Sequence, residues 1–159
     1  MSEAKVYPVP ADYAACTSLD ADAYDRRYAQ SLQDPASFWA EEAACVRWSR
    51  RFTEVQDVSF RREDFRIRWF ADGELNLSDN CLDRHLATQP EKTAIIWEGD
   101  HPSEQRYISY RELHREVCRL ANALKAEGIQ AGDRITIYMP MIPETAVAML
   151  ACARIGAVH

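Results

Sequence analysis

The chain has 159 residues, a hydrophobic content of 47% and a formal net charge of −6. This length and composition suit one globular domain with a hydrophobic core. The negative charge argues against nucleic acid as the main partner, because binding to phosphates requires an excess of basic residues.

The cysteines and the hydropathy pattern indicate a cellular compartment. The five cysteines are widely spaced and form no CxxC pair, which is typical of reduced thiols in a cytosolic protein. The N-terminal residues lack the basic stretch and apolar core of a secretory signal. The longest uncharged apolar run, Ala146 to Ala153, is too short to span a bilayer. We therefore expect a soluble, cytoplasmic protein without membrane association.

The first part of the chain predicts helices that follow an irregular arm. Residues up to about Ser18 contain prolines and show little periodicity, which favours irregular structure. Asp20 is a suitable N-cap for a helix that carries Tyr24, Tyr28 and Leu32 at four-residue spacing.

A second helix is predicted directly afterwards. Asp34 can cap its start, and Pro35 occupies the first helical position, where its missing N–H costs nothing. One face of this helix would hold the residues Trp39, Ala43 and Val46. Residues 51–70 mix aromatic, charged and β-branched residues, which indicates short extended segments.

After a third predicted helix, which carries Leu82 and Leu86 on one face, the pattern changes to alternating strands and helices. Thr93 to Trp97 and Arg106 to Ile108 are short apolar runs that predict strands. The turn residues Gly99 and Pro102 lie between these two runs.

The helix that follows these strands has clear start and stop signals. Ser109 and Glu112 have the spacing of a capping box, and Gly128 lies where a C-terminal cap belongs. The apolar face between them consists of Leu113, Val117, Leu120 and Leu124.

The last predicted elements are a strand and a buried helix. Arg134 to Met139 predicts a strand, Pro143 begins a helix that is apolar on nearly every side, and Gly156 ends it. The order of elements indicates an α/β fold with a parallel sheet. Such a helix must be covered on every side, and few strands precede it. We therefore expect an incomplete domain that exposes apolar surface and self-associates.

Two cysteine–histidine pairs are the only metal-site hypothesis that the residues suggest. Cys81 with His85, and His114 with Cys118, each have the four-residue spacing of one helix face. Together they could form a Cys2His2 zinc site if the two helices packed face to face. Packing is the favoured interpretation, because both pairs flank apolar core positions and the spacing arises easily by chance.

Other catalytic patterns are missing from the sequence. The five glycines form neither GxGxxG nor GxxxxGK, and no GxSxG is present. The adjacent carboxylates Glu41-Glu42 and Glu63-Asp64 favour a solvated surface. Acidic residues interrupt the arginine-rich stretch between Arg47 and Arg68, which favours a surface of mixed charge over an anion-binding strip. The loop Pro140 to Pro143 follows a predicted strand, where open α/β sheets tend to bind ligands, but a scaffold role is favoured.

Five segments, taken in order, carry a family resemblance. They are WFADGELNLSDNCLDRH (Trp69 to His85), KTAIIWEGD (Lys92 to Asp100), ISYREL (Ile108 to Leu113), GDRITIYMPMIPE (Gly132 to Glu144) and AMLACARIGAVH (Ala148 to His159). Read together, they resemble the start of the AMP-forming acetyl-CoA synthetases (acetate–CoA ligases) of the adenylate-forming superfamily. The resemblance implies an N-terminal extension over residues 1–85 and a truncated start of the AMP-binding (adenylation) domain over residues 86–159.

The resemblance also implies a reaction for the intact enzyme. Acetate would attack ATP to give acetyl-adenylate, and the thiol of coenzyme A would then displace AMP, with Mg as the metal. The family's phosphate loop, ribose-binding aspartate, catalytic lysine and coenzyme A nucleotide segment have no counterpart in residues 1–159. We therefore assign no catalytic, cofactor-binding or metal-binding residue, and we expect the chain alone to bind none of these molecules.

The partner implied by the resemblance is the remainder of the same polypeptide, with its mobile C-terminal domain. The extension would wrap the main body of the enzyme and bury aromatic residues such as Trp39, Trp48 and Trp69. Propionyl- and acetoacetyl-CoA synthetases begin with similar sequences. The choice of acetate as the substrate therefore rests on how closely the five segments match the acetyl-CoA synthetases. The alternative is a stand-alone α/β binding or regulatory module without catalysis.

Overall fold

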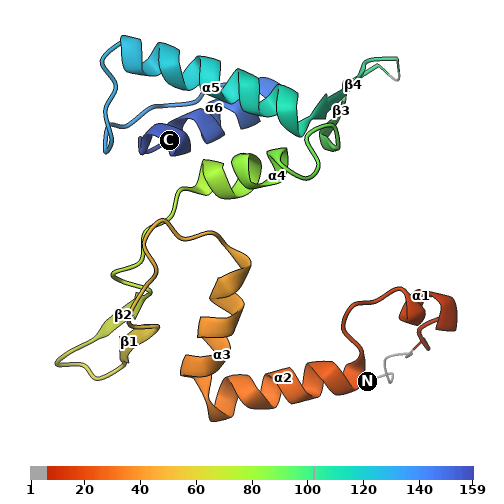
Figure 1. Cartoon of the computed structure of the whole chain (residues 1–159), viewed down its shortest axis with the longest axis vertical. Helices are drawn as coiled ribbons and strands as arrows, with labels where there is room; N and C mark the ends of the chain where they lie inside the picture. The colour runs from red at the N-terminus through yellow and green to blue at the C-terminus, as the bar shows by residue number, and fades with distance from the viewer. Residues whose placement is uncertain (1–6, 102) are drawn as a thin grey trace, which may run out of the picture. The chain divides into compact units, whose positions relative to one another are not determined.

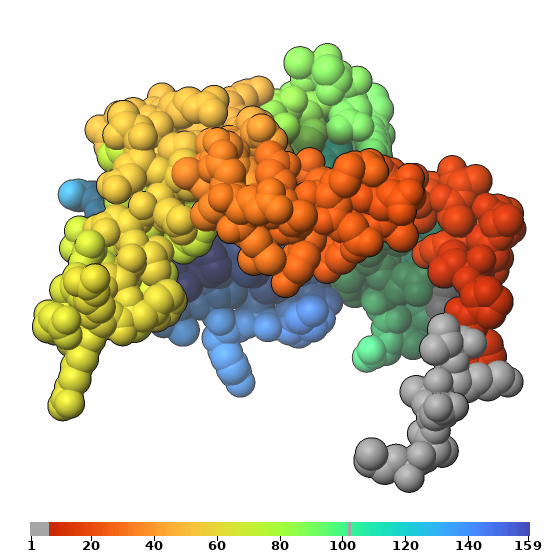
Figure 2. All heavy atoms as spheres, turned by 90° about the horizontal axis from the view of Figure 1, so that it is seen from below, coloured from red at the N-terminus to blue at the C-terminus, as the bar shows by residue number. Residues whose placement is uncertain are grey.

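The computed structural model describes residues 7–101 and 103–159, which form two compact units. One unit ends at Cys45 and the other comprises Val46–His159. Figure 2 shows the heavy atoms, with the remaining residues in grey. The predicted turn residue Pro102 lies outside the described residues. No helix within the described ranges is long and apolar enough to cross a membrane.

In the described part of the first unit, all regular secondary structure is helical (Figure 1). It contains α1 (Ala11–Ala15), α2 (Ala21–Gln33), α3 (Pro35–Glu42) and a short 3-10 helix (Ala43–Cys45). The prediction of an irregular arm was wrong for α1, because three alanines in five residues favour one helical turn after Pro10.

Local capping chemistry starts both longer helices of this unit, as predicted. The carboxylate of Asp20 accepts a hydrogen bond from the Ala23 N–H at 2.7 Å. The carboxylate of Asp34 accepts one from the Ser37 N–H at 3.2 Å, and the hydrogen bonds of the Ser37 side chain and backbone lower the pKa of the carboxyl group. Each cap satisfies one of the N–H groups that a helix start leaves unpaired.

In the second unit, the predicted extended segments form a β-hairpin. The strands β1 (Gln56–Ser59) and β2 (Arg66–Trp69) are antiparallel, with Val58 opposite Ile67. Beside the hairpin, the rings of Trp48, Phe52 and Phe70 pack together, with centroids 4.5–5.5 Å apart. Gly73 is required beside this cluster, because a Cβ atom there would lie 2.6 Å from the indole of Trp48.

The burial that the resemblance implies for three tryptophans refers to the intact enzyme, and their exposure within this chain differs. Trp39 and Trp69 are 40% and 41% exposed, whereas Trp48 is half-buried. Trp39 contacts the neighbouring Phe38 edge to face, and Trp69 contacts Phe70.

The helix predicted around Leu82 exists, with an unexpected geometry. Residues Asp79–Asp83 form a π-helical segment that continues into α4 (Arg84–Leu86). Leu82 is only 1% exposed and belongs to the hydrophobic core of the second unit. A π-helical turn often occurs where side chains must meet particular partners, and this one contains Asp83.

The predicted strand pair and the helix after it are confirmed. The strands β3 (Thr93–Glu98) and β4 (Gln105–Ser109) are antiparallel and lead into α5 (Tyr110–Ala126). The hydroxyl of Ser109 accepts a hydrogen bond from the Glu112 N–H, and the Glu112 carboxylate accepts one from the Ser109 N–H at 2.9 Å. Gly128 has φ +89°, which suits the residue that ends a helix.

This capping box leads to a stability prediction. Replacing Ser109→Ala removes the side-chain acceptor at the start of α5, so we expect the free energy of unfolding to fall by about 1 kcal/mol. Urea denaturation followed by tryptophan fluorescence measures the change. An unchanged midpoint would show that the cap does not stabilise α5, and Ser18→Ala, at an exposed position outside the helices, provides the control for loss of a hydroxyl.

The core of the second unit lies between α5 and α6 (Pro143–Ile155), which run side by side (Figure 1). Val117 and Ala151 are completely buried, as predicted for an apolar α5 face and an apolar α6. Gly156, with φ +76°, ends α6 in the left-handed conformation.

The strand predicted over Arg134–Met139 was wrong in extent. Only Arg134 forms a β-bridge, parallel to Val158, and the segment is otherwise irregular. The N–H of Ile135 donates to the Val158 carbonyl at 2.8 Å, and the Val158 N–H donates to Asp133. A strand requires hydrogen-bonded neighbours along its whole length. Within the described residues, this segment is paired with a neighbouring segment at a single bridge.

Candidate functional site

The candidate site is a polar cluster where the 76–83 segment meets the end of α6. The side-chain amide of Asn76 donates hydrogen bonds to the carbonyls of Ala153 and Arg154, at 3.1 and 3.2 Å. These carbonyls lie in the last turn of α6, where the regular helical hydrogen bonds run out, and the Ala153 carbonyl also accepts from the Gly156 N–H at 3.2 Å. Asn76 therefore joins two segments that are more than 70 residues apart.

A two-fold ion pair lies next to this contact. The guanidinium of Arg154 donates to both carboxylate oxygens of Asp83, at 2.7 and 2.8 Å. Both side chains are 26% exposed, so water screens the pair less than it screens a surface pair. The Arg154 guanidinium lowers the pKa of the Asp83 carboxyl group, and Asp83 raises the pKa of Arg154.

A histidine and a cysteine from α5 extend the cluster. The Nε2 atom of His114 lies 3.3 Å from Asp83 Oδ1, 3.3 Å from Arg154 Nη2 and 3.5 Å from Cys118 Sγ. One imidazole nitrogen thus faces a carboxylate, a guanidinium and a thiol. The cluster combines an acid, a base, a cation and a thiol within hydrogen-bonding range.

The second predicted pair occupies different surroundings. His85 packs against the ring of Tyr110, with centroids 4.9 Å apart, and its Nδ1 lies 3.2 Å from Gln89 Nε2. Cys81 is exposed. Among the described residues, no group of three or more His, Cys, Asp or Glu residues could hold a metal ion.

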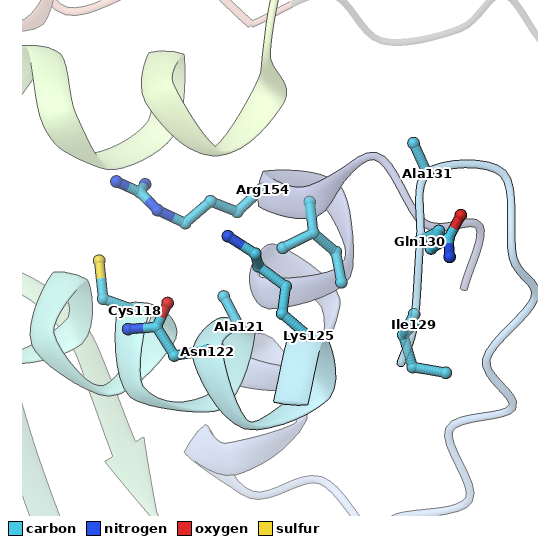
Figure 3. Close-up of a pocket in the computed structure, with 9 residues that line it drawn as sticks. Cys118, Ala121, Asn122, Lys125, Ile129, Gln130, Ala131 and Arg154 are labelled. Carbon is cyan, nitrogen blue, oxygen red and sulfur yellow. The ribbon is translucent and has the colours of Figure 1, made fainter. Parts of the chain in front are cut away.

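An open hollow of about 600 Å³ adjoins the cluster (Figure 3). Cys118 and Arg154 form part of its wall, and Lys125 extends into it from the end of α5. The rest of the lining comprises Ala121, Asn122, Ile129, Gln130, Ala131 and Ile155. The hollow combines positive charge with amide groups, which is the chemistry of a site for a small anion.

The Pro140–Pro143 loop is held in place by hydrogen bonds to its backbone carbonyls. The indole N–H of Trp97 donates to the Met141 carbonyl at 2.8 Å, and the Thr145 hydroxyl donates to the Pro140 carbonyl. A second, largely apolar hollow of about 320 Å³ lies between this loop and β3. These bonds fix the entry into α6, in agreement with the favoured scaffold interpretation.

Acidic residues accompany the arginine-rich stretch, as the sequence suggested. Arg66 binds Asp57 and Asp64, and further ion pairs join Arg47 to Asp79 and Arg50 to Glu74. The adjacent carboxylates of the sequence do not combine into a site either: Glu42 pairs with Arg27, and the Asp64 carboxylate accepts from Ser59 and Arg66.

The described residues do not fit ATP or a magnesium ion. A phosphate site requires several N–H donors from a glycine-rich loop, and the sequence contains no such loop. The guanidinium of Arg154 lies in the larger hollow, but Asp83 binds it through both donor groups. We therefore derive no step of phosphate chemistry from these residues.

Sequence reasoning did not identify Asn76, Asp83 or Arg154 as partners. Asp83 and Arg154 are 71 positions apart, and no local pattern connects them. The available signal was the family resemblance, because the WFADGELNLSDNCLDRH segment contains Asn76 and Asp83 and the AMLACARIGAVH segment contains Arg154. The polar residues of the first segment contact the end of α6, which gives a structural reason for their presence.

Comparisons with known proteins place the chain in a family. A family model described as acetyl-coenzyme A synthetase N-terminus matches residues 24–81, and one described as AMP-binding enzyme matches residues 82–159. The acetyl-coenzyme A synthetase of Novosphingobium aromaticivorans is 58% identical over 160 aligned positions, which cover 100% of this chain and 24% of the relative. The synthetase of Vibrio cholerae is 55% identical, with the same coverage.

A solved structure gives the same result for the fold. Acetoacetyl-CoA synthetase from Streptomyces lividans superimposes with a TM-score of 0.73 at 28% sequence identity, over 93% of this chain and 22% of that one. The chain thus spans about a quarter of the length of the curated relatives that it matches. On these matches, the chain belongs to the acetyl-CoA synthetases of the adenylate-forming enzymes, and it corresponds to their N-terminal part.

Proposed function

We propose that this chain forms the N-terminal part of a ligase that activates acetate with ATP and transfers the acetyl group to coenzyme A. The observation that carries the proposal is the 58% identity to an acetyl-coenzyme A synthetase over the whole chain. Acetate as the acyl group rests on this identity, because acetoacetyl-CoA synthetase shares the fold at 28% identity. The intact enzyme would use ATP, coenzyme A and Mg in the cytoplasm.

The role of these residues in that enzyme is structural. Residues 1–85 would form the N-terminal extension and residues 86–159 the start of the adenylation domain, with the remainder of the polypeptide as the partner. The Asn76 contact to the end of α6 supports this role, because it joins the segments that the two family models match. The two segments would then act as one rigid support for the rest of the domain.

The alternative is a stand-alone binding or regulatory module. The hollow beside Lys125 and Arg154 is the feature that favours it, because this hollow has the chemistry of a small-molecule site. A binding assay of the chain with small anions tests this alternative, which predicts binding at the hollow by the chain alone.

We predict that the chain alone has no acyl-activating activity. The adenylation step is reversible, so acetate-dependent exchange of labelled pyrophosphate into ATP reports it directly. We expect no exchange above a blank without protein, because the sequence contains no glycine-rich phosphate loop. Exchange that requires acetate and rises with the concentration of the chain would contradict the structural role.

We further predict that the chain self-associates in solution. Tyr138 is 100% exposed, Met141 90% and Met149 43%, and the three lie on or just before the apolar helix α6. Exposed apolar surface of this kind drives association or binds hydrophobic dyes. Light scattering and dye fluorescence on dilute samples test this, with Met141→Gln as the variant that should weaken both signals. A monomer that binds no dye would favour the stand-alone module.

A further inference from the structure

We draw no further inference here: the strongest candidate, the side-chain cluster of Asp83, His114 and Arg154 where α5 and α6 meet the 79–83 segment, taken as a pH-sensitive contact, belongs to the site already described, and its geometry gives no direction to the effect of protonation, because His114 Nε2 lies 3.3 Å from the carboxylate and 3.3 Å from the guanidinium.

Discussion

The Asp83→Asn variant should lose about 2 kcal/mol of unfolding free energy, because it leaves the guanidinium of Arg154 partly buried without a counter-charge. Losing one partner of a fully buried pair costs about 3–5 kcal/mol, and the 26% exposure of both side chains reduces this value. Urea denaturation of the dilute chain, followed by tryptophan fluorescence, measures the loss.

A matched control exists in the same unit. Arg106 and Glu144 form a pair at 2.7 Å, but their side chains are 50% and 48% exposed. Water screens this pair, so Glu144→Gln should change stability by less than about 1 kcal/mol. Equal losses for Asp83→Asn and Glu144→Gln would show that the Asp83–Arg154 pair has no special role.

The pH dependence of this pair has a defined sign. Because the hydrogen bonds from Arg154 lower the pKa of folded Asp83, the unfolded chain binds a proton at this residue more readily than the folded chain does. The stabilisation is therefore fully present above the unfolded pKa, about 3.9, and is lost as the pH falls through the folded pKa. The difference between wild type and Asp83→Asn should stay constant from pH 7 to 5 and shrink below pH 4. A difference that does not shrink there would show that ionised Asp83 is not its source.

Local sequence patterns predicted the helix starts well. Asp20, Asp34 and the pair Ser109 and Glu112 act within four residues of the positions that they cap, so a short window contains the whole interaction. The same holds for Gly156, where the left-handed conformation follows from the lack of a Cβ atom. These features depend little on the rest of the fold.

Contacts between distant segments could not be predicted in this way. The Asp83–Arg154 pair and the Asn76 cap depend on how the 76–83 segment packs against α6. The strand expected after Asp133 depends on neighbouring strands, and in the described part of the chain only Val158 pairs with it. For the site, the sequence correctly placed His114 and Cys118 in contact on one helix, but it could not reveal Arg154 or the hollow beside them.

The proposed role of these residues is that of the N-terminal part of an acetyl-CoA synthetase. Its direct test is a hybrid enzyme in which this chain replaces the matching 24% of the Novosphingobium aromaticivorans relative. At 58% identity, most contacts between the two parts should be retained. A relative that lacks the matching part serves as the negative control.

The measurement is acetate-dependent exchange of pyrophosphate into ATP by the purified hybrid. We predict exchange of the same order as that of the unaltered relative, and none from the truncated control. Asp83→Asn in the hybrid should lower its thermal stability more than its exchange rate at low temperature, because the pair supports the fold and does not touch the reactants. A soluble, folded hybrid without acetate-dependent exchange would contradict the assignment of this chain to acetate activation.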